Sequence, residues 1–176
     1  MNMSAIDNTP QNKNFLSPLN FQFSLKRAPN INFFIQKVAL PSISVPEIEM
    51  PTIFNYIPEP GNKLTYGELQ ITFKVDEDFA NYLEIHNWIR ALTSPESFRG
   101  YKELTSNQEY TGNGKHSDIS LIVLNSVKTP NFEVTFRNAY PSSLSGIEFD
   151  TTLDDVQYLT STASFKYMLY DITKIV

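Results

Sequence analysis

The chain has 176 residues and a formal net charge of −5, and 41% of its residues are hydrophobic, including thirteen Phe and nine Tyr. This length allows one domain with a sizeable core, and the aromatic content favours a globular protein rich in sheet. The negative charge excludes a strongly basic nucleic-acid-binding surface, and the absence of cysteine excludes disulfides and thiolate chemistry.

The N-terminal residues 1–14 are polar and have a single basic side chain, Lys13. We expect a flexible segment here rather than a secretory signal. Residues 15–176 are expected to form one domain. No window approaches eighteen consecutive apolar residues, so the sequence predicts a soluble protein without membrane insertion, made in a cytoplasm.

The first predicted strand covers Phe21 to Leu25, where apolar and polar residues alternate with period two. The tripeptide Ala28–Pro29–Asn30 predicts a turn, and Phe33 to Leu40 predicts a returning strand that ends at Pro41. Together these elements predict a β-hairpin.

Residues 41–66 form a proline-rich segment with prolines at 41, 46, 51, 58 and 60. Proline at this density excludes a helix and a central strand, yet many of the residues between are apolar. The segment either folds over its own core or extends as an arm that buries its apolar groups on a neighbouring subunit. The residues predicted to make such inter-subunit contacts are Ile43, Val45, Ile48, Met50, Ile53 and Phe54.

The clearest strand pattern runs from Leu69 to Val75. The acids of Asp76–Glu77–Asp78 then favour a helix N-terminus, and a helix is predicted from Phe79 to about Leu92. Its packing face is predicted to include Phe79, Tyr82, Leu83, His86 and Ile89. Residues 97–116 are polar, contain Gly112–Asn113–Gly114 and predict a mobile loop.

The C-terminal third predicts strands over Ser117 to Asn125 and Phe132 to Arg137, a corner at Tyr140–Pro141, and one long closing strand from Val156 to Tyr170. Because helices do not alternate with strands, a parallel doubly wound sheet is excluded. The predicted fold class is mainly β, an antiparallel β-barrel or sandwich with one α-helix.

The sequence predicts no catalytic, cofactor-binding or metal-ligating residues. The two histidines, His86 and His116, lack the spacing of a ligand pair, and His86 is expected to pack within the helix face. The acidic residues Glu148, Asp150, Asp154 and Asp155 are the one set that could be catalytic. They lie among Thr, Ser and Gly, where solvation favours an ordinary loop over a tuned general acid.

Several segments, in order and spacing, resemble the tail tube proteins of contractile-tailed bacteriophages. The resemblance covers most of residues 15–172. It rests on Ser17–Phe23, Ile35–Pro41, Leu64–Leu69, Asp76–Ala91 with Trp88, Asn138–Leu144, Ile147–Asp150 and Val156–Tyr170. Phe98 to His116 is longer than in the family pattern, and the N-terminus is extended.

The resemblance implies a structural subunit of the inner tail tube, in the virion, assembled in the host cytoplasm. It implies homo-hexameric rings whose strands join across subunits into one ring-shaped barrel, stacked within a contractile sheath. Sheath, tape measure, baseplate and terminator proteins are the implied partners, and DNA passes through to the host without specific binding. The acidic residues Glu148, Asp150, Asp154 and Asp155 are expected to face the lumen, where they would repel phosphate.

Four alternatives remain open on the sequence. The two departures from the family pattern also fit a tube-like baseplate subunit or a tail-tube terminator. The tube protein of a related contractile injection system would share the same patterns. An enzyme on a small β-barrel is a rival of another class, and it would require a convergent polar site.

Overall fold

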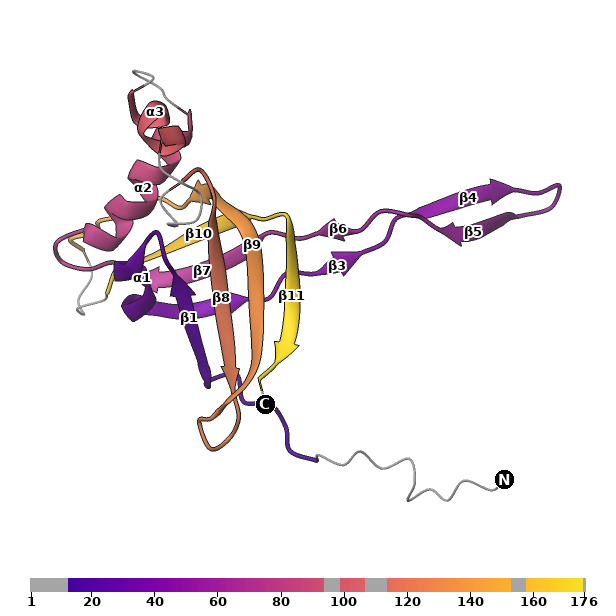
Figure 1. The fold of residues 1–176 in the computed structure, drawn as a ribbon, viewed down its shortest axis with the longest axis horizontal. Coiled ribbons are helices and arrows are strands. Elements are labelled where there is room, and N and C mark those ends of the chain that lie inside the picture. Colours follow the sequence, from indigo (N-terminus) through magenta and orange to yellow (C-terminus); the bar gives the residue numbers. More distant parts are fainter. Residues whose placement is uncertain (1–12, 94–98, 107–113, 153–157, 176) are drawn as a thin grey trace.

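Strands that bury alternate side chains build the body of the protein, and a long hairpin projects from it (Figure 1). The structure is a computed structural model that describes residues 13–93, 99–106, 114–152 and 158–175. The body strands are β1 (Phe21–Leu25), β2 (Ile35–Ala39), β7 (Leu69–Lys74), β8 (Ser117–Leu124), β9 (Pro130–Leu144), β10 (Thr160–Lys166) and β11 (Leu169–Lys174). The projecting strands are β3 (Ile43–Ser44), β4 (Glu47–Pro51), β5 (Tyr56–Pro60) and β6 (Thr65–Tyr66).

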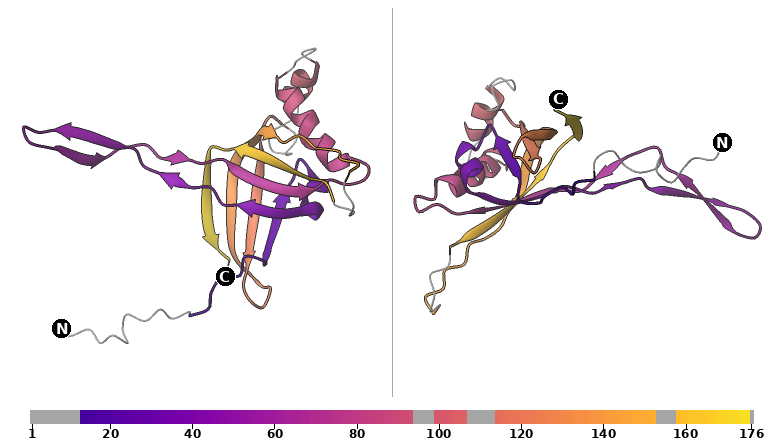
Figure 2. Two further views of the ribbon diagram at one scale, coloured as in Figure 1. Left: turned by 180° about the vertical axis from the view of Figure 1, so that it is seen from behind. Right: turned by 90° about the horizontal axis from the view of Figure 1, so that it is seen from below.

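The body strands follow the order β1-β8-β9-β10-β7-β2, with β11 also paired to β9, and all these pairs are antiparallel. The strand β9 belongs to two sheets. Its first part pairs with β8 and β11 in sheet A, which also contains β1, and its last part pairs with β10 in sheet B, which also contains β7 and β2. Figure 2 shows the strands of sheet B crossing those of sheet A. The described strands form no closed barrel, so the predicted fold class is correct only as mainly β and antiparallel.

The corner predicted at Tyr140–Pro141 lies where β9 passes from sheet A to sheet B. Asn138 has a left-handed backbone (φ 54°), and its amide donates to Asp118 Oδ1 at 3.0 Å. Beyond it, Pro141 lies within the strand opposite Phe165, next to a register shift. The predicted corner at Tyr140–Pro141 is therefore wrong, since a bent strand tolerates proline at an irregular position.

The closing segment also differs from its prediction. Two strands, β10 and β11, stand where one long strand was predicted, and they pair with different parts of β9. Ile147 to Asp150, which the sequence predicts as a short strand before the closing strand, is not a strand, and Val156 lies outside the described residues.

The core fills the space between the two sheets and α2 (Ala80–Thr93). Phe73, Phe136 and Phe165 are fully buried, and the Trp88 ring of α2 lies 6.2 Å from the Phe165 ring. The strand patterns of β1, β7 and β8 were thus predicted correctly from the alternation that buries one face.

The helices differ from the single predicted one. The predicted helix is α2, displaced by one residue at each end, but its fully buried residues are Asn81, Ile85 and Trp88, while Leu83 is exposed. Of the predicted packing face, Tyr82 and Ile89 do pack against the core, but the centre of the buried face was predicted incorrectly. The acids Asp76 to Asp78 precede the helix rather than entering its first turn.

Two short helices were missed. A helix, α1 (Pro29–Phe34), replaces the predicted turn and the start of the returning strand, because proline at a first helical position is favourable. Consequently β1 pairs with β8 and β2 with β7, and the predicted hairpin between them is wrong. A third helix, α3 (Arg99–Ser106), lies within the predicted loop 97–116, of which residues 97, 98 and 107–113 are outside the described part.

No helix among the described residues combines the length and the apolar character needed to cross a lipid bilayer.

Candidate assembly surfaces

The proline-rich segment is an extended two-stranded arm. Its strands pair β3 with β6 and β4 with β5, and every residue from Ser42 to Pro60 is exposed (Figure 1). Gly61 donates its amide to Pro46 O at 2.7 Å, where a Cβ would lie 2.5 Å from that oxygen. Glycine is therefore required at this point for the two strands of the arm to approach.

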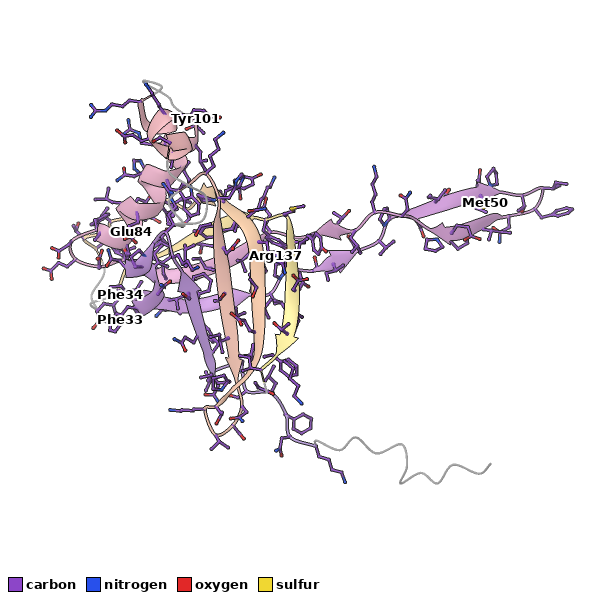
Figure 3. The ribbon with its side chains drawn as sticks, viewed as in Figure 1. Phe33, Phe34, Met50, Glu84, Tyr101 and Arg137 are labelled. Atoms are coloured by element: carbon purple, nitrogen blue, oxygen red, sulfur yellow. The ribbon has the colours of Figure 1, made fainter. Side chains whose placement is uncertain are left out.

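The apolar residues of the arm gather on one face and at the tip. Because cross-strand neighbours share a face, Ile48, Met50 and Ile57 lie together, with Glu59 beside Ile48. Figure 3 labels Met50 well away from the body. At the tip, Ile53 and Phe54 are 92% and 96% exposed. Ile43 and Val45, nearer the body, are exposed as well.

The opposite face of the arm carries two carboxylates among prolines. Glu47 and Glu49 share the face opposite Ile48, and no Lys or Arg occurs from Ser42 to Asn62. An exposed apolar stripe is costly to leave in water and indicates a contact surface. The role of these residues between subunits remains a prediction.

Sheet A has a second, polar face opposite the core. Its paired residues form two rows across the four strands, Gln22–Ile122–Glu133–Thr173 and Ser24–Ser120–Thr135–Asp171. Arg137 reaches Asp171 at 2.8 Å on this face. The face carries Ser, Thr and Gln side chains together with the acids Asp118, Glu133 and Asp171 and the base Arg137, and we refer to it as the wet face.

The edge of β1 is free only over part of its length. Leu124 N donates to Asn20 O at 3.0 Å, which makes Asn20 and Leu124 a hydrogen-bonded pair of the antiparallel ladder. The main-chain groups of the even-numbered residues of β1 therefore bond to β8, and those of the odd-numbered residues point away from β8. At Leu25 the Asn32 side chain takes the place of a strand, accepting from Leu25 N at 2.8 Å and donating to Leu25 O at 3.3 Å. Phe21 and Phe23 thus keep their main-chain groups directed to the edge, beside a groove of about 710 Å³ lined by β1, α1 and β2.

The other edge of sheet A is β11. Ile175 donates to Asn131 O at 2.9 Å, so the odd-numbered residues of β11 bond to β9. Tyr170, Ile172 and Lys174 therefore direct their main chain outward. Sheet A thus ends in two strand edges able to pair with another chain.

The candidate carboxylates do not form a catalytic site in the described part of the chain. Glu148 and Asp150 are exposed, beyond the point where β9 has joined sheet B, and the neighbouring Phe149 ring stacks at 6.3 Å on Phe79 beside α2. Hydrogen bonds from the Thr152 hydroxyl and amide lower the pKa of Asp150. A lowered pKa is the opposite of what a general acid needs. Asp154 and Asp155 lie outside the described residues.

The histidines lie in aromatic surroundings. His86 stacks on Tyr82 at 6.5 Å and His116 meets Tyr140 edge-on at 5.7 Å. Within the described ranges no group of three or more His, Asp or Glu side chains could hold a metal ion.

Comparisons with known proteins agree on one kind of assembly. A family model described as phage tail tube protein matches residues 5–173. The tail tube terminator protein of Enterobacteria phage T4 is 25% identical over 162 residues, which are 88% of this chain and 87% of that protein.

Solved structures share the fold. A chain of the anti-feeding prophage cap, described as a tube terminating cap, has a TM-score of 0.62 at 15% identity and covers 98% of this chain and 100% of its own. A chain of the sheath-tube complex of the PVC extracellular contractile injection system, in the extended state, has a TM-score of 0.59 at 16% identity. The match covers 93% of this chain and 94% of that chain. At these identities the likeness concerns the fold alone.

Proposed function

Because the chain belongs to the phage tail tube protein family and is thus a structural protein of the phage tail in the virion, we propose that it forms the ring that ends the tube of a contractile tail. The observation that carries the proposal is the likeness to the T4 tail tube terminator protein along nearly the full length of both chains. This favours the terminator alternative over the stacked inner tube as the first choice.

The second candidate is the main tube subunit, forming stacked hexameric rings that conduct DNA. It is supported by the family model and by the shared fold with the PVC sheath-tube complex. The tube protein of a related contractile injection system has the same support. The candidates differ in one property: a main tube subunit stacks on itself, whereas a terminator closes a ring and stops.

Ring closure has a direct structural route through sheet A. Its strands alternate in direction from β1 through β8 and β9 to β11, so β1 runs antiparallel to β11. A neighbour related by rotation about a ring axis would place its β11 beside β1 in an antiparallel ladder. Repeating this contact, six times by the family resemblance, joins the sheets into one barrel.

The same closure decides which face lines the channel. The core face of sheet A carries sheet B and α2, so this bulk must lie outside the barrel and the wet face inside. A lining of Ser, Thr and Gln in which acids outnumber the single Arg137 would not bind DNA strongly. The rival assignment places the acidic residues Glu148, Asp150, Asp154 and Asp155 in the lumen.

The two lumen assignments are separated by a matched pair of charge reversals. Glu133→Lys changes the wet face, and Glu148→Lys makes the same change beside α2. If the wet face lines the channel, Glu133→Lys should slow genome delivery from otherwise normal particles, and Glu148→Lys should not. The reverse pattern would support the acidic lumen.

The proposal includes no chemistry. We expect neither catalysis nor a cofactor, and the expected partners are the tube, sheath, tape measure and baseplate proteins, with DNA passing without specific binding. The function is tested by incubating the purified chain alone and with the tube protein of the same tail, followed by electron microscopy. Closed rings from the chain alone, together with shorter capped tubes in the mixture, support a terminator. Long tubes from the chain alone support the main tube subunit. If the chain forms neither rings nor tubes and does not cap the tube protein, both candidates are refuted.

A further inference from the structure

Tyr167 and Tyr170, near the junction of β10 and β11, each donate a hydrogen bond to one of the two stems of the arm. The stems are the residues at which the arm leaves the body, Pro41–Ser42, and returns to it, Tyr66–Gly67. The arm leaves β2 at Pro41 and returns to β7 at Gly67. From the segment joining β10 to β11, the Tyr167 hydroxyl donates to Gly67 O at 2.9 Å, and from the start of β11 the Tyr170 hydroxyl donates to Pro41 O at 3.4 Å. Each stem therefore has its own donor, although the tyrosines lie 100 and 129 positions away along the chain.

The rings of the same residues enclose an arm side chain. Tyr66, the last residue of β6, lies 5.8 Å from the Tyr167 ring and 5.6 Å from the Tyr170 ring. Phe136 lies beneath both at 5.0 and 5.4 Å and is fully buried in the core. We call these four residues, Tyr66, Phe136, Tyr167 and Tyr170, the aromatic clamp, because they connect the arm to the core with edge-on and tilted contacts.

The stems are also held to each other. Gly67 donates to Ser42 O at 2.9 Å, and a Cβ at Gly67 would lie 3.0 Å from Ser42 Oγ and 3.3 Å from Ser42 N. The missing side chain lets the two stems lie side by side at the point where the clamp acts.

From these contacts we propose that Tyr167 and Tyr170 are positioning residues that fix the direction of the arm before it meets a partner. Beyond the clamp the arm has no buried residue, so its direction is decided at the stems. The chain from Pro41 to Ile53 spans about 40 Å at about 3.3 Å per residue. A swing of about 20° at the stems would move the tip by about 14 Å, which is about three strand spacings and enough to miss a specific contact site on a neighbouring subunit.

A fixed arm has a binding advantage. A hairpin held in its bound direction loses less conformational freedom on association, which raises affinity without a new contact. The benefit to assembly rests on the proposed function, whereas the fixed direction is a property of the isolated chain. The two can therefore fail separately.

The test measures the arm in the isolated protein. The chain contains no cysteine, so Phe54→Cys at the tip and Val127→Cys on an exposed turn of the body give two clean spin-label sites. Double electron–electron resonance then reports the distribution of distances between them. We expect one narrow distribution in the parent, and about twofold broadening or more when Tyr167→Phe and Tyr170→Phe are combined, given the lever above.

The matched control is Tyr82→Phe. The Tyr82 hydroxyl also donates to a main-chain oxygen, Ser145 O at 3.4 Å, but this hydrogen bond lies away from the arm. The control should leave the distribution narrow. Since phenylalanine keeps the rings, the clamp variants should unfold at nearly the parent denaturant concentration. Tyr66→Ala, which changes the arm side of the clamp, provides a second variant and should broaden the distribution as well.

A broad distribution in the parent, or a narrow one in both the tyrosine pair and Tyr66→Ala, would overturn the proposal. Ring formation by the same proteins is scored separately by electron microscopy. Rings from a parent with a broad distribution would leave the proposed function intact while removing the clamp from it.

Discussion

The arm should be removable without loss of the folded body. Because Gly61 N already donates to Pro46 O, replacing Glu47–Pro60 with Asn-Gly would turn this cross-strand pair into the ends of a two-residue turn. Every residue removed is exposed, and an isolated two-stranded hairpin is marginally stable at best. We therefore expect the free energy of unfolding to change by no more than about 0.5 kcal/mol, or about 1–2 °C in Tm.

Urea unfolding followed by tryptophan fluorescence measures this change, since Trp88 is buried in the body. Electron microscopy of the same variant measures assembly. We expect capping or stacking to be lost, because the shortened chain lacks the contacts that the arm would make with a neighbouring subunit. A loss of more than about 2 kcal/mol would show that the arm is part of the fold. Unaltered capping or stacking by the shortened chain would remove the arm, with Ile48, Met50 and Phe54, from the assembly mechanism.

Three further predictions concern the core, the aromatic clamp and the binding of metal ions. Phe165→Ala should destabilise the protein by about 3–5 kcal/mol in urea, whereas Phe54→Ala should change stability by less than about 0.5 kcal/mol; equal effects would contradict the burial described. Burial, with smaller contributions from Tyr170 and Tyr66, raises the pKa of Tyr167 to about 12. Because this pKa is raised on folding, the associated stability is complete below about pH 10 and is lost as pH rises through about 12. Tyrosinate absorbance should show a step near pH 12 that Tyr167→Phe lacks, and an unchanged titration would argue against the assignment. Elemental analysis of the purified chain should find no stoichiometric transition metal, and one equivalent of tightly bound zinc would refute this.

Strands whose faces differ in burial were predictable from the sequence. In β7, Leu69, Ile71 and Phe73 lie in the core and the residues between them do not, so the period of two is visible without knowledge of the partner. The helix α2 was predictable for a similar reason, although only Tyr82 and Ile89 of its predicted packing face contact the core and its fully buried residues were missed. Asn81 is buried there because its amide donates to Lys74 O at 2.8 Å, a contact that apolar periodicity does not reveal.

Strand pairing was not predictable from local pattern. The partner of β1 is β8, about a hundred residues away, while the sequence offered a nearby segment that also alternates. Pro29 and Pro141 were interpreted as breaks, yet one begins a short helix and the other lies at the irregular part of a bent strand. The helix α3 has only eight residues, with Leu104 buried among polar ones, and a segment this short is below the length over which a helical period is recognised in a sequence.

The assembly surfaces were partly visible in the sequence. The concentration of Ile and Met among prolines left two possibilities open, a segment folded over its own core or an extended arm, and the structure shows an exposed arm. The wet face could not be found in this way, because Gln22, Ser120, Thr135 and Asp171 are brought together only by the register of four strands. The aromatic clamp likewise joins residues from distant positions.

The central claim is that the chain closes into rings through β1 and β11. The most direct test is the native mass of the purified protein, compared between the wild type, Ile172→Pro and Ile172→Ala. Ile172 directs its amide to the free edge of β11, so proline there removes a donor for the neighbour without breaking the ladder to β9, while alanine keeps the donor. We predict a closed hexamer of about 120 kDa for the wild type and for Ile172→Ala, and a folded monomer of 20.1 kDa for Ile172→Pro. A wild type that stays monomeric at all concentrations, or an Ile172→Pro variant that still forms hexamers, would contradict closure through this edge.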